Sequence, residues 1–127
     1  MNTTTHFLIK GMSPQLVVSN IERSIEFYTE KLGFAVEFRY SDFYVGIIKD
    51  GYTVHLKSGN LSVEERKNKR VNEDLDIIFS VKDIEYLYEE LSNRSVQFLQ
   101  PLRTMPYGKE FYVADPDGYI IAFLEES

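Results

Sequence analysis

Few side chains in this 127-residue chain could carry out chemistry by themselves. The chain has no cysteine, which excludes disulfides, thiolate metal sites and cysteine nucleophiles. It also lacks a nucleophile elbow, a P-loop and a dinucleotide-binding fingerprint. Of the two histidines, His6 lies in an N-terminal segment that matches no motif, and we expect it to be solvated or packed within that tail. His55 lies in a β-rich run and is the histidine that could line a site.

Aromatic rings are more abundant, with nine Tyr, nine Phe and no Trp. Side chains of a strand alternate between two faces, so Phe38 and Tyr40 share one face of their strand, and His55 and Lys57 share one face of theirs. Such rings bind planar or cationic ligands by stacking. The competing interpretation for Phe38 is plain core packing, and for His55 it is a pocket-lining or hydrogen-bonded histidine.

A second group of candidates lies in and after segment 101–108, which contains two prolines and which we predict to be a loop. Tyr107 combines a ring with a polar tip near the end of this loop, and charged residues flank it. We expect Arg103, Tyr107, Glu110 and Phe111 to line a ligand pocket, with core packing as the alternative for Phe111.

Composition excludes several classes of function. The length and a hydrophobic content of 43% predict one folded domain. A net charge of -6 argues against nucleic acid, which requires a basic surface. No apolar run approaches the roughly 20 residues of a membrane helix, and no secretory signal opens the chain. We therefore expect a cytoplasmic protein whose acidic surface suits a neutral or cationic small molecule.

The elements that must position these residues follow from the hydrophobic pattern. A helix is predicted from Ile21 to Leu32, after a capping box formed by Ser19 and Glu22 and before Gly33. A second helix is predicted after Asp83 as its N-cap. Strands are predicted at 14–18, 34–38, 43–48, 52–56, 75–81, 96–99, 110–114 and 119–124, with 58–72 as a polar linker.

This order of elements, β-α-β-β-β, occurs twice. A shift of 63 residues aligns identical residues around the two helices, namely Val18 with Val81, Ile21 with Ile84, Glu22 with Glu85 and Glu26 with Glu89. Shifts of 67 and 68 align the segments DGY (50–52 with 117–119) and FYV (43–45 with 111–113). We therefore predict an α+β fold of two tandem βαβββ modules, about 13–58 and 74–126, joined by a linker at 59–73 in one domain, 1–127.

Three stretches, in this order, resemble the vicinal oxygen chelate superfamily, which includes glyoxalase I, bleomycin resistance proteins and extradiol dioxygenases. They are LVVSNIERSIEFYTEKLGF (16–34), DFYVGIIKDGYTVHL (42–56) and PYGKEFYVADPDGYIIAF (106–123), and the last is most similar to the bleomycin resistance subgroup. The resemblance implies that the two modules form a curved, cup-shaped mixed sheet and that two chains pair as a homodimer enclosing two pockets. It also implies that Tyr107 matches an aromatic residue that contacts the drug in that subgroup.

The resemblance places the ligands of metal-using members at Ser13, His55, Asp76 and Ala122. Alanine has no donor atom and a serine hydroxyl is a poor ligand, whereas an open catalytic site needs about three protein ligands. We therefore expect no metal and no other cofactor. We expect Asp76 to face the mouth of the cup or to pair with a cation.

The resulting hypothesis is a metal-independent protein of the bleomycin-resistance type that sequesters an aromatic or cationic ligand, such as a bleomycin-like drug, in clefts between subunits. The alternative is a metal-dependent lyase, isomerase or dioxygenase of the glyoxalase superfamily with degenerate metal ligands. We predict no catalytic residue. The predicted ligand-binding residues are Phe38, Tyr40, His55, Asp76, Arg103, Tyr107, Glu110 and Phe111.

Overall fold

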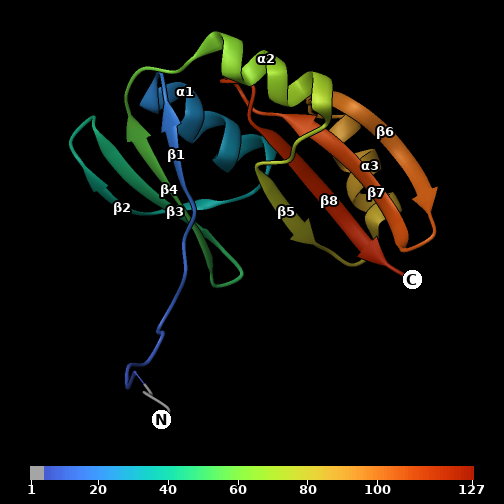
Figure 1. The fold of residues 1–127 in the computed structure, drawn as a ribbon, viewed down its shortest axis with the longest axis horizontal. Coiled ribbons are helices and arrows are strands. Elements are labelled where there is room, and N and C mark those ends of the chain that lie inside the picture. The colour runs from blue at the N-terminus through green and yellow to red at the C-terminus, as the bar shows by residue number, and fades with distance from the viewer. Residues whose placement is uncertain (1–4) are drawn as a thin grey trace.

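The computed structural model describes residues 5–127 as two open four-stranded sheets that lie side by side (Figure 1). The first module comprises β1 (Gln15–Val18), α1 (Ile21–Glu26), a π-helical segment η1 (Phe27–Lys31), β2 (Ala35–Tyr40), β3 (Tyr44–Lys49) and β4 (Tyr52–Ser58). After α2 (Val63–Asn72), the second comprises β5 (Ile77–Ser80), α3 (Ile84–Ser92), β6 (Gln97–Met105), β7 (Gly108–Ala114) and β8 (Ile120–Glu126). The strand orders are β1-β4-β3-β2 and β5-β8-β7-β6, which confirms the predicted fold of two βαβββ modules. None of the helices within residues 5–127 is long and apolar enough to cross a membrane.

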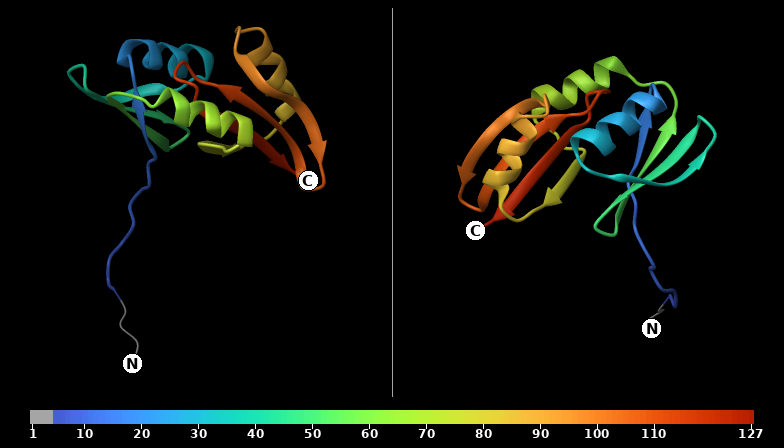
Figure 2. Two further views of the ribbon diagram at one scale, coloured as in Figure 1. Left: turned by 45° about the horizontal axis from the view of Figure 1, so that its top comes forward. Right: turned by 180° about the vertical axis from the view of Figure 1, so that it is seen from behind.

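Helices α1 and α3 lie on the same side of the two sheets, which the right-hand view of Figure 2 shows from the front. The strand residues that face these helices form the core, and Val45, Ile47, Phe111 and Val113 are fully buried. Figure 1 shows the opposite side, where the strands of both sheets are in view and α2 lies at one end of them. We call the sheet surfaces that face away from α1 and α3 the open faces of module one and module two.

Strand pairing confirms the internal repeat. Gln15 lies opposite His55 in the parallel pair β1–β4, and Ile78 lies opposite Ala122 in the parallel pair β5–β8. These positions differ by the same shifts of 63 and 67 that align the sequence with itself. The two modules therefore have equivalent parallel strand pairs.

The FYV segments, in contrast, are not equivalent in the two hairpins. Gly46 lies opposite His55, whereas Tyr112 lies opposite Ala122. Gly46 and Tyr112 are therefore equivalent, which requires a shift of 66 rather than 68. The similarity between the two FYV segments is displaced by two residues along the strand, and such a displacement keeps each side chain on the same face of the sheet.

The helix N-termini are capped by groups other than those predicted. Asn20, not Ser19, caps α1, because its side chain accepts a hydrogen bond from the Arg23 N–H at 3.0 Å. Helix α3 begins after Asp83 as predicted, but the Asp83 side chain makes no capping bond. The carboxylate of Glu125 in β8 accepts from the N–H groups of Asp83 and Ile84 instead, at 3.0 and 3.1 Å. A residue distant in sequence thus satisfies backbone donors at the start of the helix.

Two segments predicted without regular structure contain it. The linker includes α2, where Ser62 accepts from the Glu65 N–H at 3.1 Å, acids occupy the first turn and bases the last. No residue of α2 is buried, so the apolar periodicity that indicates a helix is missing. The segment predicted as the 101–108 loop continues β6 through Pro101, because the pairing with β7 shifts register between Gln100 and Arg103 and does not require a donor at every residue.

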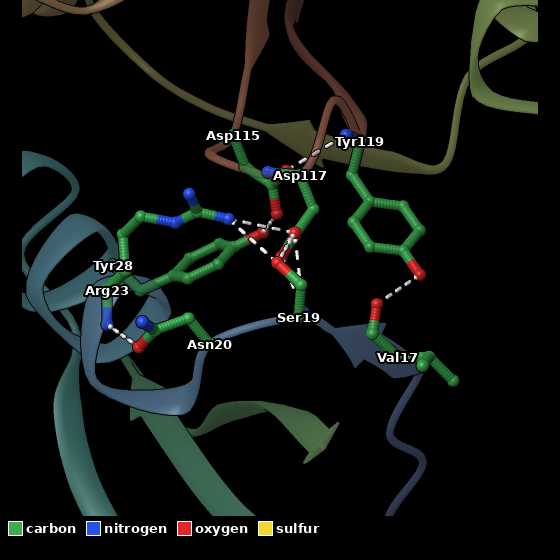
Figure 3. A network of polar contacts seen from close by, with 8 residues as sticks. All are labelled: Val17, Ser19, Asn20, Arg23, Tyr28, Asp115, Asp117 and Tyr119. Carbon is green, nitrogen blue, oxygen red and sulfur yellow. Dashed lines mark hydrogen bonds and ion pairs between the residues drawn. The ribbon is translucent and has the colours of Figure 1, made fainter. Parts of the chain in front are cut away.

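A polar network joins the two modules at one end (Figure 3). The Tyr28 hydroxyl, from the first module, donates to the buried carboxylate of Asp115 at 2.9 Å. Asp117 accepts from Ser19 at 2.5 Å and from Arg23 at 3.1 Å. Burial raises the pKa of Asp115 to about 6, although three hydrogen bonds to its carboxylate favour the charged form. The turn at 115–119 is therefore fixed against α1.

Candidate functional site

The open face of module one carries a cluster of rings that we call the aromatic wall, formed by Phe38, Tyr40, Tyr44 and His55. The Phe38 ring lies 5.5 Å from Tyr40 and stacks against Tyr44 at 6.2 Å with an interplanar angle of 15°. It meets the His55 imidazole edge to face at 5.2 Å. Tyr40 is 60% exposed, and the other three side chains are partly exposed. The wall therefore offers ring surface on which a flat ligand could stack.

Gly46 of β3 makes room for this wall. A Cβ atom at this position would lie 2.1 Å from Cε2 of Phe38, far inside van der Waals contact. The absence of a side chain therefore lets the Phe38 ring lie directly against the sheet. This role of Gly46 was not predicted, although a glycine inside a predicted strand often marks a close approach by another group.

Hydrogen bonds orient His55 within the wall. The Gln15 amide donates to the Tyr44 hydroxyl at 3.0 Å, and that hydroxyl lies 2.9 Å from Nδ1 of His55. The bond between the Tyr44 hydroxyl and Nδ1 holds the imidazole in place within the wall, and the tautomer of His55 decides which of the two atoms donates. Gln15 and Tyr44 were not predicted. The sequence signal for Tyr44 is strand alternation, which places it on the face that carries His55.

The open face of module two carries an ionic cluster centred on the buried carboxylate of Glu110. Arg103 binds this carboxylate through Nε at 2.8 Å and through a terminal nitrogen at 2.6 Å. The hydroxyls of Tyr107 and Tyr112 donate to it at 2.7 and 3.1 Å. The Arg103 guanidinium also lies 5.4 Å from the centroid of the Tyr112 ring. Arg103, Tyr107 and Glu110 were predicted and come together, whereas Tyr112 was missed.

This cluster keeps Glu110 charged. Burial raises the pKa of Glu110, but the hydrogen bonds from Tyr107, Arg103 and Tyr112 outweigh burial and hold the pKa below its usual value. The same bond to Glu110 raises the pKa of the Tyr107 hydroxyl. The polar groups of the cluster thus satisfy one another, and the exposed part of Tyr107 is its ring, with 47% of the residue accessible.

Asp76 pairs with two cations, which is the second of the two arrangements expected for it. Its carboxylate accepts from Arg66 at 3.0 Å and from Lys69 at 2.6 Å, both on α2. It also accepts from the Ile120 N–H at 2.8 Å. The guanidinium of Arg66 lies 4.3 Å above the Tyr119 ring. Asp76 therefore anchors α2 to the second sheet.

The four positions at which the resemblance places metal ligands do not fit a divalent ion in this chain. The Ser13 hydroxyl is hydrogen-bonded to Thr53, and both oxygens of Asp76 are neutralised by cations. Nδ1 of His55 is bonded to a tyrosine, and Ala122 offers no donor. Within residues 5–127 no three His, Asp or Glu side chains gather closely enough to hold a metal ion.

Phe111 lies apart from the other predicted residues. It is fully buried, and its ring packs against Tyr88 at 5.1 Å and Phe123 at 5.0 Å on the side of α3. Its neighbour Glu110 faces the open side, so strand alternation directs Phe111 into the core. The core alternative therefore describes Phe111, and ligand contact does not.

The remaining predicted residues lie in three places rather than in one pocket, namely the aromatic wall, the Glu110 cluster and Asp76 beside α2. A groove of about 610 Å³ lies where the sheets meet, between the segment that leads into β1, the start of β4, and β5. Asp76 and Ser13 line this groove, but His55 and Tyr107 do not. A single chain thus presents the aromatic wall and the Glu110 cluster on different sheets.

The chain belongs to the Glyoxalase/Bleomycin resistance protein/Dioxygenase superfamily, because the model of this family matches residues 5–123. The resemblance noted in the sequence is therefore confirmed. No curated protein sequence matches the chain.

Solved structures share the fold. An antibiotic-binding protein from Streptomyces sp. CB03234 is 18% identical, with 97% of this chain and 100% of that chain covered and a TM-score of 0.72. A bleomycin-binding protein from Streptomyces verticillus, in complex with copper(II)-bleomycin, is 22% identical, with 98% and 100% covered and a TM-score of 0.70. A superfamily member from Sphaerobacter thermophilus is 22% identical, with 94% and 98% covered and a TM-score of 0.68.

Proposed function

We propose that this member of the superfamily is a metal-independent binding protein that sequesters a small aromatic or cationic molecule in clefts between two copies of the chain. The observation that carries the proposal is the aromatic wall of module one, which is partly exposed in a single chain. The function requires no covalent step, because enclosure, stacking and charge complementarity supply the affinity.

The chemistry of the wall favours a flat or cationic ligand. Tyrosine and phenylalanine faces attract cations as well as stacking on planar groups. The net charge of -6 favours the approach of a cation over that of an anion. Proteins of the same fold include an antibiotic-binding and a bleomycin-binding protein. A bleomycin-class drug, which is a cationic glycopeptide, is therefore the first ligand to test.

A second copy of the chain would enclose such a ligand. Exposed apolar side chains extend beyond the wall and include Phe43 at 58% and Ile78 at 58% exposure. An apolar surface of this kind on an open sheet is typical of a binding or assembly surface. We propose that module two of the partner covers the wall and that Tyr107, held by its hydrogen bond to Glu110, supplies a ring on the other side of the ligand.

Titration with metal-free bleomycin and with copper(II)-bleomycin tests the proposal. Because the chain has no tryptophan, its intrinsic fluorescence comes from tyrosine, and changes in it report binding. Calorimetry gives the stoichiometry independently. We expect saturable binding of one drug per chain and a dimer in analytical ultracentrifugation. Tyr40→Ala should weaken binding about tenfold by removing one stacking ring. Tyr86→Ala is the matched control, because Tyr86 is similarly exposed, at 65%, but lies on α3.

Three results would contradict parts of this proposal. Absence of saturable binding would exclude the drug-specific version. Full binding by a monomer would exclude a cleft between subunits. Stoichiometric nickel, zinc, manganese or iron in the purified protein, lost in His55→Ala, would favour the alternative of a metal-dependent enzyme.

A further inference from the structure

The turns that close the two equivalent hairpins have different surroundings. The turn at 115–119 is fixed against α1 through the bonds of Tyr28 to Asp115 and of Ser19 and Arg23 to Asp117 (Figure 3). The equivalent turn of module one contains Asp50 and Gly51, both with positive φ, and the Asp50 side chain is 79% exposed. The turn of module two is thus tied by hydrogen bonds to the other module, whereas the turn of module one leaves its aspartate exposed.

The groups that tie the turn of module two have no counterparts at the turn of module one. By the shift of 63 residues, Tyr28 corresponds to Leu91, which cannot donate a hydrogen bond, and Ser19 corresponds to Lys82. Between the turn of module one and α3 the structure instead has a groove of about 490 Å³. This volume lies in the range of small-molecule sites.

The floor of the groove is apolar and largely aromatic. Phe34, Phe79 and Phe123 form a continuous row of rings, with centroids 5.8 and 5.6 Å apart, and all three line the groove. Leu87 and Leu91 of α3 line it as well. The rings are tilted by 52° and 34° to one another, and Phe79 and Leu87 are the partly exposed members of the floor. An aromatic ligand therefore gains burial of apolar surface by packing against Phe79 and Leu87.

The rim of the groove carries one more cation than anion. Arg94 is bonded to Glu90 at 3.2 Å, and Lys49 lies 3.7 Å from Asp50. Lys82 also lines the groove, and within residues 5–127 no acid lies within ion-pair distance of its ammonium group. An apolar floor beside an available ammonium group is complementary to an aromatic body that carries a single carboxylate.

We propose that this groove is a second binding site, specific for a small aromatic carboxylate, with the rings on the phenylalanine row and the carboxylate at Lys82. The site is on the opposite side of the sheets from the aromatic wall, between the turn of module one and α3. It differs from the proposed drug cleft in its lining, because none of the four residues of the aromatic wall lines the groove. It is also complete within one chain.

Calorimetric titration with naphthoate tests this site, and naphthamide serves as the neutral probe of the same shape. We expect one naphthoate per chain and binding about tenfold weaker for naphthamide, which cannot form the ion pair. Lys82→Gln should weaken naphthoate binding about tenfold and leave naphthamide binding unchanged. Lys67→Gln, an exposed lysine of α2, is the matched control and should bind naphthoate as the unaltered chain does.

Two further variants locate the site. Leu87→Trp should abolish naphthoate binding by filling the groove, and a melting curve checks that this variant folds. Tyr40→Ala should leave naphthoate binding unchanged, which separates this site from the aromatic wall. Equal affinity for naphthoate and naphthamide, or unaltered affinity in Lys82→Gln, would overturn the proposal. Loss of a dimer in Lys82→Gln would also overturn it, by assigning the groove to a contact between subunits.

Discussion

The two open faces are built on equivalent strands, yet they differ in how each uses its polar groups. In module one the cross-strand pair is Gly46 and His55, and in module two it is Tyr112 and Ala122. The small residue lies on β3 in one module and on β8 in the other. Each pair thus combines one small residue with one ring, but the ring is an imidazole on β4 in module one and a phenol on β7 in module two.

This difference has a consequence for binding. In module one the rings remain partly exposed, and the hydrogen bonds of Gln15 and Tyr44 orient the imidazole without covering it. In module two the polar atoms of Arg103 and Glu110 are occupied by one another and by tyrosines. The face of module one thus leaves ring surface exposed, whereas the polar groups on the face of module two bind one another.

The largest expected effect is on the pH dependence of the free energy of unfolding, which should differ between variants in the turn of module two and in the turn of module one. Because burial raises the pKa of Asp115 to about 6, the folded state binds more protons than the unfolded state between the unfolded pKa and 6. Asp115 therefore costs stability as pH rises through this window. The free energy of unfolding of Asp115→Asn, relative to that of the unaltered chain, should therefore rise by up to roughly 3 kcal/mol between pH 4 and pH 7.5.

Urea denaturation of both proteins at several pH values measures this difference. Asp50→Asn in the exposed turn of module one is the control and should show a constant difference from the unaltered chain. A constant difference for Asp115→Asn would show that burial does not perturb this carboxyl.

The second prediction concerns the Glu110 cluster on the face of module two. Glu110→Ala should lower the free energy of unfolding by about 2 kcal/mol, because it leaves a partly buried guanidinium and two hydroxyls without their acceptor. His55→Ala, at a partly exposed position of module one, should cost about 1 kcal/mol or less, because Tyr44 keeps its bond to Gln15. Chemical denaturation compares the two variants, and equal losses would remove the distinction between the faces.

The third prediction concerns the space that Gly46 leaves for the Phe38 ring of the aromatic wall. Gly46→Ala should cost about 1.5 kcal/mol, because the new Cβ collides with the Phe38 ring and displaces it. In a chain that already carries Phe38→Ala, the same change should be nearly neutral, since nothing then occupies that space. A double-mutant cycle in urea measures the coupling. Additive effects of the two changes would mean that the ring does not depend on the glycine.

The smallest effect compares the two aspartates of the DGY turns. Asp117→Asn should cost about 1 kcal/mol, because it weakens the bonds from Ser19 and Arg23. Asp50→Asn should change stability very little, because the Asp50 side chain is exposed and asparagine tolerates positive φ. Thermal melts at one pH are sufficient, and similar shifts for both variants would show that the turns are equally fixed.

The sequence alone predicted features that depend on local pattern and internal repetition. The two modules follow from the repeated order of elements and the shift of 63 residues. The strand partners Gln15 with His55 and Ile78 with Ala122 were not predicted, and the pairing of Asp76 with a cation was one of two alternatives. The capping of α3 by Glu125 was not predictable, because the partners lie 41 and 42 residues apart. Helix α2 was missed since it buries no residue, although Ser62 and Glu65 form a recognisable capping pattern.

The candidate site was predicted in part for the same reason. Tyr107, Arg103 and Glu110 are close in sequence, so their proximity in space could be anticipated. Gly46 acts on Phe38 of the adjacent strand, and the displaced FYV similarity gave a misleading register for it. Tyr112 binds Glu110 of its own strand, and alternation along β7 was a signal that could have identified it. Cross-strand register is set by the turn and by pairing over the whole strand, which a three-residue match does not determine.

Lys31 and Arg94, which occupy equivalent positions in the two modules, form a reciprocal contact. The Lys31 side chain donates to the Arg94 carbonyl, and the Arg94 side chain donates to the Lys31 carbonyl at 2.9 Å, with 63 residues between them. In a symmetric dimer of single modules this would be one residue that meets its own copy, as isologous contacts require. Because each acceptor is a backbone atom, the contact tolerates a change of one side chain from arginine to lysine. The two halves therefore differ in sequence at this pair of equivalent positions and still keep the reciprocal contact between them.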